Sequence, residues 1–276
     1  MRILHTSDWH IGRTFHGYAT IDALRGVLDE MVSIVREEAV DLVIVAGDVF
    51  DSAAPAAECY TVLTDALVGL REAGAQVIVT SGNHDSAARL GFQARLLRDG
   101  IHVLTDPTRL DVPVTVTDVH GPVHVYGIPY LAPAQVRHLW PQAELRTQAQ
   151  TLQHAMDLVR ADHSERGGRS VVVSHCFAAG IEATPGLERE IRQGSLDVVP
   201  LSVFDGPDYV ALGHIHGRQQ LSDRVRYAGA PLHYGFGEKG RRRGVWIVDL
   251  DESGLASVAW RDLSIPRRLE VLRAPL

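Results

Sequence analysis

The first 80 residues alternate between short apolar runs and longer stretches with helical periodicity, and this order constrains the fold more than any other feature. Apolar runs cover residues 2–6, 41–46 and 75–80, and the middle run is continuous, as in a strand buried on both faces. Between them, residues 22–38 and 56–72 carry apolar side chains at helical spacing. This β-α-β-α-β order predicts a parallel sheet with crossover helices, whose ligands bind at the carboxyl ends of the strands.

The rest of the chain predicts further strands and fewer helices. Helical patterns are found at residues 86–97 and 143–162, and strand patterns at 112–117, 123–128, 170–174, 209–212, 225–227, 244–250 and 256–263. Residues 178–200 have weak periodicity and several charges, which indicates a long surface excursion of a kind that is often functional. We expect one α/β domain over residues 1–264, followed by an exit segment over 265–276.

The composition is that of a globular protein, with 45% hydrophobic and 22% charged residues. No apolar run is long enough to span a bilayer, and no basic-then-apolar leader precedes the first strand. Cys59 and Cys176 are too few for a disulfide framework. We therefore expect a soluble cytoplasmic protein without a membrane partner. The net charge of −7 argues against binding nucleic acid by bulk electrostatics, although local charge can differ.

Side chains that can bind metal follow five of the expected strands. These side chains are Asp8 and His10, Asp48, Asn83 and His84, His175, and His214 and His216. Carboxylate, amide oxygen and imidazole suit divalent manganese or iron, whereas the absence of thiolates argues against structural zinc. Two dications about 3.5 to 4 Å apart need a shared carboxylate. Asp48, on the central strand, is the candidate for that bridge.

Each motif is weak alone. Residues 82–85 are also typical of a solvated turn, because Gly, Asn and Asp favour turns. A lone histidine is more often structural than ligating. A metal site is favoured because every candidate ends its own apolar strand. Histidines without this placement, such as His5, are expected to have surface or packing roles.

These residues resemble the motifs of the calcineurin-like metallophosphoesterases. The matching segments are Asp8-x-His10, GDVFD at 47–51, GNHD at 82–85, His175 and GHIH at 213–216. More narrowly, MRILHTSDWHIG at 1–12 and AGDVFD at 46–51 resemble the SbcD-type group, the nuclease subunits of bacterial SbcCD complexes. The likeness continues through residues 128–130, 208–216 and 226–231, and so covers nearly the whole chain.

The resemblance implies a four-layer α/β/β/α sandwich with two mixed sheets. It implies two divalent ions, manganese being the expected metal, one held by Asp8, His10, Asp48 and His216, the other by Asp48, Asn83, His175 and His214. His84 would be the catalytic histidine beside the scissile phosphate and not a ligand. Asp51 or Asp85 would orient it, and the sequence leaves both open.

The resemblance also implies an activity and partners. SbcD-type proteins act as endonucleases and 3′–5′ exonucleases on DNA ends and hairpins in break repair, with an SbcC-type ATPase as partner. A homodimer is implied through helices matching residues 57–70 and 87–97. Such chains usually continue into a DNA-capping domain, whereas this sequence stops soon after residues 266–272, where the cap would begin. We therefore expect a nuclease core, with most contacts to the ATPase lying beyond it.

Two other hypotheses remain. A phosphodiesterase or phosphatase of the same fold that acts on small substrates would have the same ligands, so only peripheral sequence distinguishes it. The continuation at residues 51–55 and the excursion at 178–200 favour the nuclease. A catalytically silent metal-binding scaffold would lack a ligand or His84, and none is missing.

Overall fold

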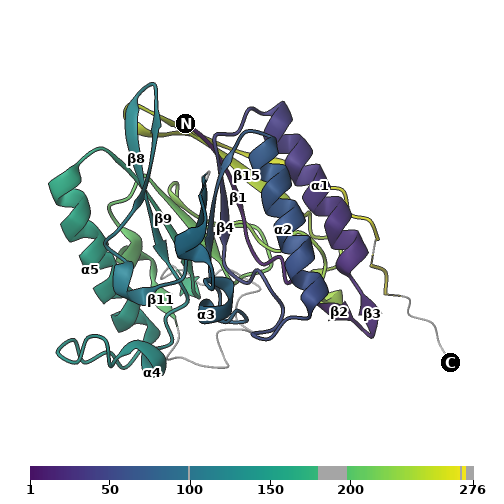
Figure 1. Ribbon diagram of the computed structural model, residues 1–276, viewed down its shortest axis with the longest axis horizontal. Helices are drawn as coiled ribbons and strands as arrows, with labels where there is room; N and C mark the ends of the chain where they lie inside the picture. The colour runs from purple at the N-terminus through teal and green to yellow at the C-terminus, as the bar shows by residue number, and fades with distance from the viewer. Residues whose placement is uncertain (99, 180–197, 268, 272–276) are drawn as a thin grey trace.

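The computed structural model describes residues 1–98, 100–179, 198–267 and 269–271. Two six-stranded sheets face each other at its centre. Helices α1 (Ile21–Glu37) and α2 (Ala57–Glu72) pack on the outer side of one sheet, and α5 (Gln148–Arg166) packs on the outer side of the other (Figure 1). The four layers therefore follow the order helix, sheet, sheet, helix, which confirms the predicted sandwich.

The first sheet has the strand order β16-β15-β1-β4-β5-β6. Its strands are β1 (Arg2–Thr6), β4 (Leu42–Ala46), β5 (Gln76–Thr80), β6 (Ile101–Leu104), β15 (Gly244–Asp251) and β16 (Gly254–Asp262). Strands β1, β4, β5 and β6 run parallel, while β15 and β16 are antiparallel to their neighbours. The carboxyl ends of β1, β4 and β5 therefore meet at one edge, as the sequence predicts.

The second sheet has the order β13-β14-β12-β9-β8-β7. Its strands are β7 (Val114–Asp118), β8 (Gly121–Ile128), β9 (Arg169–His175), β12 (Tyr209–Gly213), β13 (Gln219–Gln220) and β14 (Val225–Tyr227). The four central strands β8, β9, β12 and β14 are parallel, and both outer strands are antiparallel to their neighbours. Both sheets are therefore mixed, each with four neighbouring parallel strands.

Short elements connect these layers. They are the hairpin strands β2 (Thr14–Phe15) and β3 (Tyr18–Ala19), the paired strands β10 (Ala178–Ala179) and β11 (Val199–Pro200), the helices α3 (Ala87–Leu90) and α4 (Pro133–Val136), and the 3-10 turns η1 (Ala94–Leu96), η2 (Pro107–Arg109), η3 (Leu201–Phe204) and η4 (Phe236–Glu238). In the described part of the chain, no helix combines the length and apolar character needed to cross a membrane.

Strand β4 shows why a continuous apolar run is needed. Val43 and Val45 pack with the helices on the outer side of the sheet. Leu42 and Ile44, which point the other way because side chains alternate along a strand, pack against the second sheet. Both faces of the strand are therefore buried. Its last residue, Ala46, lies at the interface between the two sheets, which we call the seam.

Two predicted helices differ from the structure, and one strand was missed. Residues 86–97 form α3 and η1 rather than one helix, and the edge strand β6 that follows was not predicted. Helix α5 covers Gln148–Arg166 instead of residues 143–162. Its N-cap is Thr147, whose side chain accepts a hydrogen bond from the Gln150 amide, while the Thr147 amide donates to the side-chain oxygen of Gln150, a capping box. Most of the expected excursion at 178–200 lies outside the described residues.

Candidate metal centre

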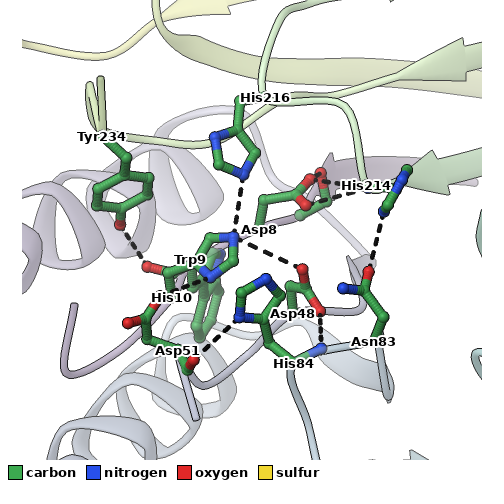
Figure 2. Close-up of polar contacts among 12 residues, drawn as sticks. Asp8, Trp9, His10, Asp48, Asp51, Asn83, His84, His214, His216 and Tyr234 are labelled. Carbon is green, nitrogen blue, oxygen red and sulfur yellow. Dashed lines mark hydrogen bonds and ion pairs between the residues drawn. The ribbon is translucent and has the colours of Figure 1, made fainter. Parts of the chain in front are cut away.

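All seven predicted ligands gather at one edge of the two sheets. Asp8 and His10 follow β1, Asp48 follows β4 and Asn83 follows β5, all in the first sheet. His175 ends β9, while His214 and His216 follow β12 in the second sheet. Figure 2 shows six of these side chains pointing toward one another from both sides of the seam: Asp8, His10, Asp48, Asn83, His214 and His216. The centre is therefore shared between the sheets.

The backbone at these ligands is unusual. Asp8, His10, Asp48 and His214 have φ angles of 54°, 46°, 49° and 109°, a region that residues other than glycine rarely adopt. Such conformations cost free energy and persist only where the surrounding structure enforces them. Each of these turns directs a side chain from a strand end toward the seam.

Two glycines permit the close approach of the loops. A Cβ at Gly82 would overlap the side chain and main chain of Asp48. A Cβ at Gly213 would overlap the carbonyl oxygen of Ala46, across the seam. The glycines that precede Asn83 and His214 are therefore required by packing, and they bring the two ligands within reach of Asp48 and β4.

The first group of ligands contains Asp8, His10 and His216. One ligand atom of each residue lies within 4.8 Å of the others. The Nε2 atoms of His10 and His216 are 3.1 Å apart (Figure 2). The carboxylate of Asp8 is buried and accepts hydrogen bonds from Ser7 Oγ at 2.5 Å and from the His214 amide at 3.0 Å. These bonds fix the carboxylate beside the two rings.

The second group surrounds Asn83. Its Oδ1 atom lies 3.0 Å from Nε2 of His175 and 2.9 Å from Nδ1 of His214. Asp48 stands between the two groups, because its Oδ2 is 3.6 Å from Nε2 of His10 and 3.4 Å from Nε2 of His175. The position of Asp48 is the one that a bridging carboxylate would need.

His84 lies beside both groups. Its amide donates to Asp48 Oδ1 at 2.9 Å, and its Nδ1 donates to the carbonyl oxygen of Asp51 at 3.0 Å (Figure 2). The ring nitrogen that remains, Nε2, is therefore the one available to substrate or metal. A side-chain atom of His84 also lies within 4.8 Å of ligand atoms of His10 and Asp48, so distance alone permits a ligand.

Of the two carboxylates expected to orient His84, neither does so by its side chain. Asp51 contacts the ring through its main-chain carbonyl, and its carboxylate instead binds Arg13 at 2.8 Å. The carboxylate of Asp85 accepts hydrogen bonds from the amides of Val49, Phe50 and Gly82. Asp85 thus joins the loop after β5 to the loop after β4.

A carboxylate that the sequence did not indicate supports His216. Glu238 in η4 accepts a hydrogen bond from Nδ1 of His216 at 2.9 Å. Glu238 is in turn held by the amide of Tyr234 at 2.8 Å and by the buried guanidinium of Arg243. Metal-binding histidines commonly donate a hydrogen bond from their second ring nitrogen to a carboxylate. An acidic residue near His216 could therefore have been expected from the sequence, although the sequence does not say which one.

The electrostatics of the centre couple Asp48 to the imidazoles. Burial opposes ionisation of Asp48, but the rings of His175 and His10 outweigh burial and hold the pKa of Asp48 below its usual range. Burial also opposes the charged ring of His175, yet the carboxylates of Asp48 and Asp8 raise the pKa of His175 to about 9. Burial and the neighbouring His175 lower the pKa of His214 to about 4. Without metal, the charged ring of His175 thus forms an ion pair with Asp48, and binding a metal would require loss of its Nε2 proton.

The lone pairs of the centre fit divalent cations. His175 donates its Nδ1 proton to the Ala46 carbonyl at 2.9 Å, so the neutral ring turns an Nε2 lone pair toward the Oδ1 acceptor of Asn83. His216 likewise uses Nδ1 for Glu238 and turns an Nε2 lone pair toward His10. Acceptors that face one another at such distances need a proton or a metal ion between them. Among the described residues, no lysine or arginine forms an ion pair with the buried carboxylates of Asp8 and Asp48, which favours a metal as that cation.

The fold and this centre together define a metal-dependent phosphoesterase. A family model described as calcineurin-like phosphoesterase matches residues 1–218, and the chain belongs to that family.

Solved structures share the fold at low sequence identity. TT1561 of Thermus thermophilus has a TM-score of 0.51 and 12% identity, over 94% of this chain and 98% of its own. A dimetal phosphatase from Danio rerio has a TM-score of 0.50 and 14% identity, over 96% and 99%. GAP50, the anchor in the inner membrane complex of Plasmodium, has a TM-score of 0.51 and 11% identity, over 97% and 90%.

Proposed function

We propose that this phosphoesterase is a DNA nuclease of the SbcD type, which hydrolyses phosphodiester bonds at DNA ends and hairpins with manganese. The observation that carries the proposal is the likeness of two segments, residues 1–12 and 46–51, to SbcD-type sequences. These two segments supply Asp8, His10 and Asp48, three of the gathered ligands, together with Asp51, which contacts His84.

The residues of the centre divide into those that would hold metal and one that would act on substrate. Asp8, His10 and His216 would hold one ion, Asn83, His175 and His214 the other, and Asp48 would contribute to both. When bound, two dications supply the positive charge that neutralises the phosphate and activates the attacking water. The departing sugar oxygen still needs a proton.

His84 is the proposed donor of that proton. Because Nδ1 is committed to the Asp51 carbonyl, the exchangeable proton of the charged ring is the one on Nε2. The ring of His84 packs edge to face against the ring of His10, with centroids 4.8 Å apart. The main-chain bond to Asp51 and the contact with His10 hold the ring in one orientation at the centre.

A second candidate function is hydrolysis of small phosphate esters. The neighbour from Danio rerio is described as a dimetal phosphatase, and its chain aligns with almost the whole of this one. The same set of ligands would serve either substrate class, so substrate choice depends on the surface around the centre.

The test compares substrates and metals in parallel. Purified protein is incubated with a DNA hairpin, duplexes with free or blocked ends, a cyclic dinucleotide, bis(p-nitrophenyl) phosphate and p-nitrophenyl phosphate, each with manganese, magnesium or zinc. We expect manganese-dependent cleavage of the hairpin and of free DNA ends. Hydrolysis of the cyclic dinucleotide or of phosphomonoesters, with no cleavage of DNA, would instead support the small-substrate enzyme.

A homodimer and an SbcC-type ATPase are the proposed partners. In the segment expected to form the dimer, Phe92 is 79% exposed and Leu96 is 71% exposed. Exposed apolar side chains of this size are typical of surfaces that another protein covers. Light scattering at micromolar concentration should give about twice the 30.2 kDa of one chain. A mass that stays at one chain on further concentration would contradict the dimer.

A further inference from the structure

Aromatic side chains gather on the surface beside the His216 side of the metal centre. The hairpin β2–β3 carries Phe15, His16 and Tyr18, and η4 carries Phe236. The Phe236 ring lies 5.1 Å from Phe15 and 5.2 Å from His16, measured between centroids. Tyr18 is 67% exposed and Phe236 is 45% exposed. We call Phe15, His16, Tyr18 and Phe236 the aromatic patch.

The hairpin presents these rings in fixed positions. His16 and Gly17 both have positive φ angles, 49° and 82°, as in the two-residue turns that match the twist of paired strands. Phe15 and Tyr18 are directly paired across the hairpin. Phe15 is buried and anchors the turn. The exposed Tyr18 ring should therefore lose little conformational entropy when it binds a partner.

Positive charge lies among the rings. The guanidinium of Arg267 stands 5.8 Å from the Phe15 ring and 5.9 Å from the Tyr18 ring. Lys239 is exposed and directly follows η4. The chain has a net charge of −7, so this basic surface contrasts with the molecule as a whole. Alternating aromatic and basic side chains form the kind of surface that binds unpaired nucleotides.

The aromatic patch is joined to the metal centre at two points. Phe236 belongs to the same turn as Glu238, which holds His216. The carbonyl of Arg13 accepts a hydrogen bond from Thr20 beyond the hairpin, and the guanidinium of Arg13 binds Asp51 at 2.8 Å. A strand lying on the aromatic patch would therefore lie beside Glu238 and Arg13, two residues that contact side chains of the centre.

We propose that the aromatic patch binds unpaired nucleotides of a DNA strand whose neighbouring phosphate enters the metal centre. Bases would stack on Tyr18 and Phe236, and Lys239 and Arg267 would contact phosphates. This inference rests on the proposed nuclease function. Nucleic acid is favoured over a protein partner because exposed rings interleaved with cations, beside a phosphoesterase centre, match both the faces of bases and the charge of the backbone.

Binding can be measured apart from cleavage. Protein in EDTA is titrated into a single-stranded oligonucleotide that contains 2-aminopurine, whose fluorescence changes when the base stacks. Tyr18→Ala combined with Phe236→Ala should weaken binding by about 5- to 150-fold for each lost stack. Tyr18→Phe should bind as the wild type does, because it keeps the ring. Val119→Ala removes a side chain that is 95% exposed between β7 and β8, away from the aromatic patch, and serves as the control.

The results of this experiment distinguish failure of the binding proposal from failure of the nuclease proposal. Loss of oligonucleotide binding in the double variant, with a cooperative melting transition retained and the Val119 control unaffected, supports the proposal. Wild-type binding in the double variant overturns it and leaves a protein as the occupant of the aromatic patch. If the wild type stacks 2-aminopurine through this patch but does not cleave DNA with any metal, the nuclease proposal fails and the binding site stands.

Discussion

Nδ1 of His216 lies 2.9 Å from the carboxylate of Glu238, and this bond decides which nitrogen of the ring faces the metal centre. With Nδ1 donating, the neutral ring presents an Nε2 lone pair toward His10. Glu238 is therefore a positioning residue for metal binding although it is 22 positions away from His216 in the chain.

Glu238→Gln should lower metal affinity by about 10- to 100-fold at the site formed with His216, as is typical when the carboxylate behind a ligating histidine is removed. Calorimetric titration with manganese is the measurement. Glu252→Gln, at an exposed carboxylate that lies 3.4 Å from His120, is the matched control. Equal manganese affinity in both variants would show that Glu238 does not orient His216.

Asp48→Asn should abolish hydrolysis and reduce the occupancy of both sites. The two groups of ligands share this side chain, and replacing it removes the negative charge that each dication would contact. Metal content is measured after loading with manganese, and two ions per chain are expected in the wild type. Asp65→Asn, at an exposed carboxylate on α2, should keep both ions. One ion in the saturated wild type would contradict the two-metal centre.

His84→Gln should retain both metals but cleave DNA about 10²- to 10⁴-fold more slowly, the usual contribution of a general acid. The loss should be smaller on bis(p-nitrophenyl) phosphate, because nitrophenolate leaves without protonation. Single-turnover rates on both substrates, together with metal content, provide the check. Equal losses on the two substrates would exclude proton donation and assign His84 to positioning the phosphate.

Metal-free protein should lose stability as the pH rises from 6.5 to about 9. The folded pKa of His175 is raised from 6.5 to about 9, so its contribution to stability is complete below 6.5 and disappears as the pH passes 9. His214, with its pKa lowered to about 4, changes stability only below 6.5. Denaturant unfolding in EDTA at several pH values measures the effect, which His175→Gln should reduce to the part contributed by His216, whose pKa is raised, despite burial, by its bond to Glu238. A pH-independent free energy of unfolding in the wild type would contradict it.

The ligands could be predicted from the sequence because strand and motif coincide along the chain. Each apolar run ends in its polar residues, and parallel pairing then brings the ends of β1, β4 and β5 together. The pairing of the second sheet against the first depends on contacts between residues far apart in sequence, such as Ile44 and Val173, which no local pattern encodes. The second sheet was therefore predicted from the resemblance to the family and not from the local sequence pattern.

Other features were missed for physical reasons. Gly91 packs so closely on Thr105 that a Cβ would overlap its hydroxyl, and α3 ends there instead of continuing to residue 97. The support of His84 comes from the carbonyl of Asp51, a group that every residue carries and no sequence motif distinguishes. Glu238 becomes a partner of His216 only after η4 folds over the end of β12.

The division of the ligands between the two sheets also bears on assembly. Asp8, His10, Asp48 and Asn83 come from the first half of the chain, and His175, His214 and His216 come from the second. Neither of these two sets of ligands is complete alone. An ion can therefore bind tightly only when the two parts of the chain have packed together. By linkage, each bound dication opposes separation of the sheets, much as a covalent crosslink would. Removal of the metal with a chelator should therefore destabilise the packing between the sheets around Ala46 and Gly213 before it affects the outer helices.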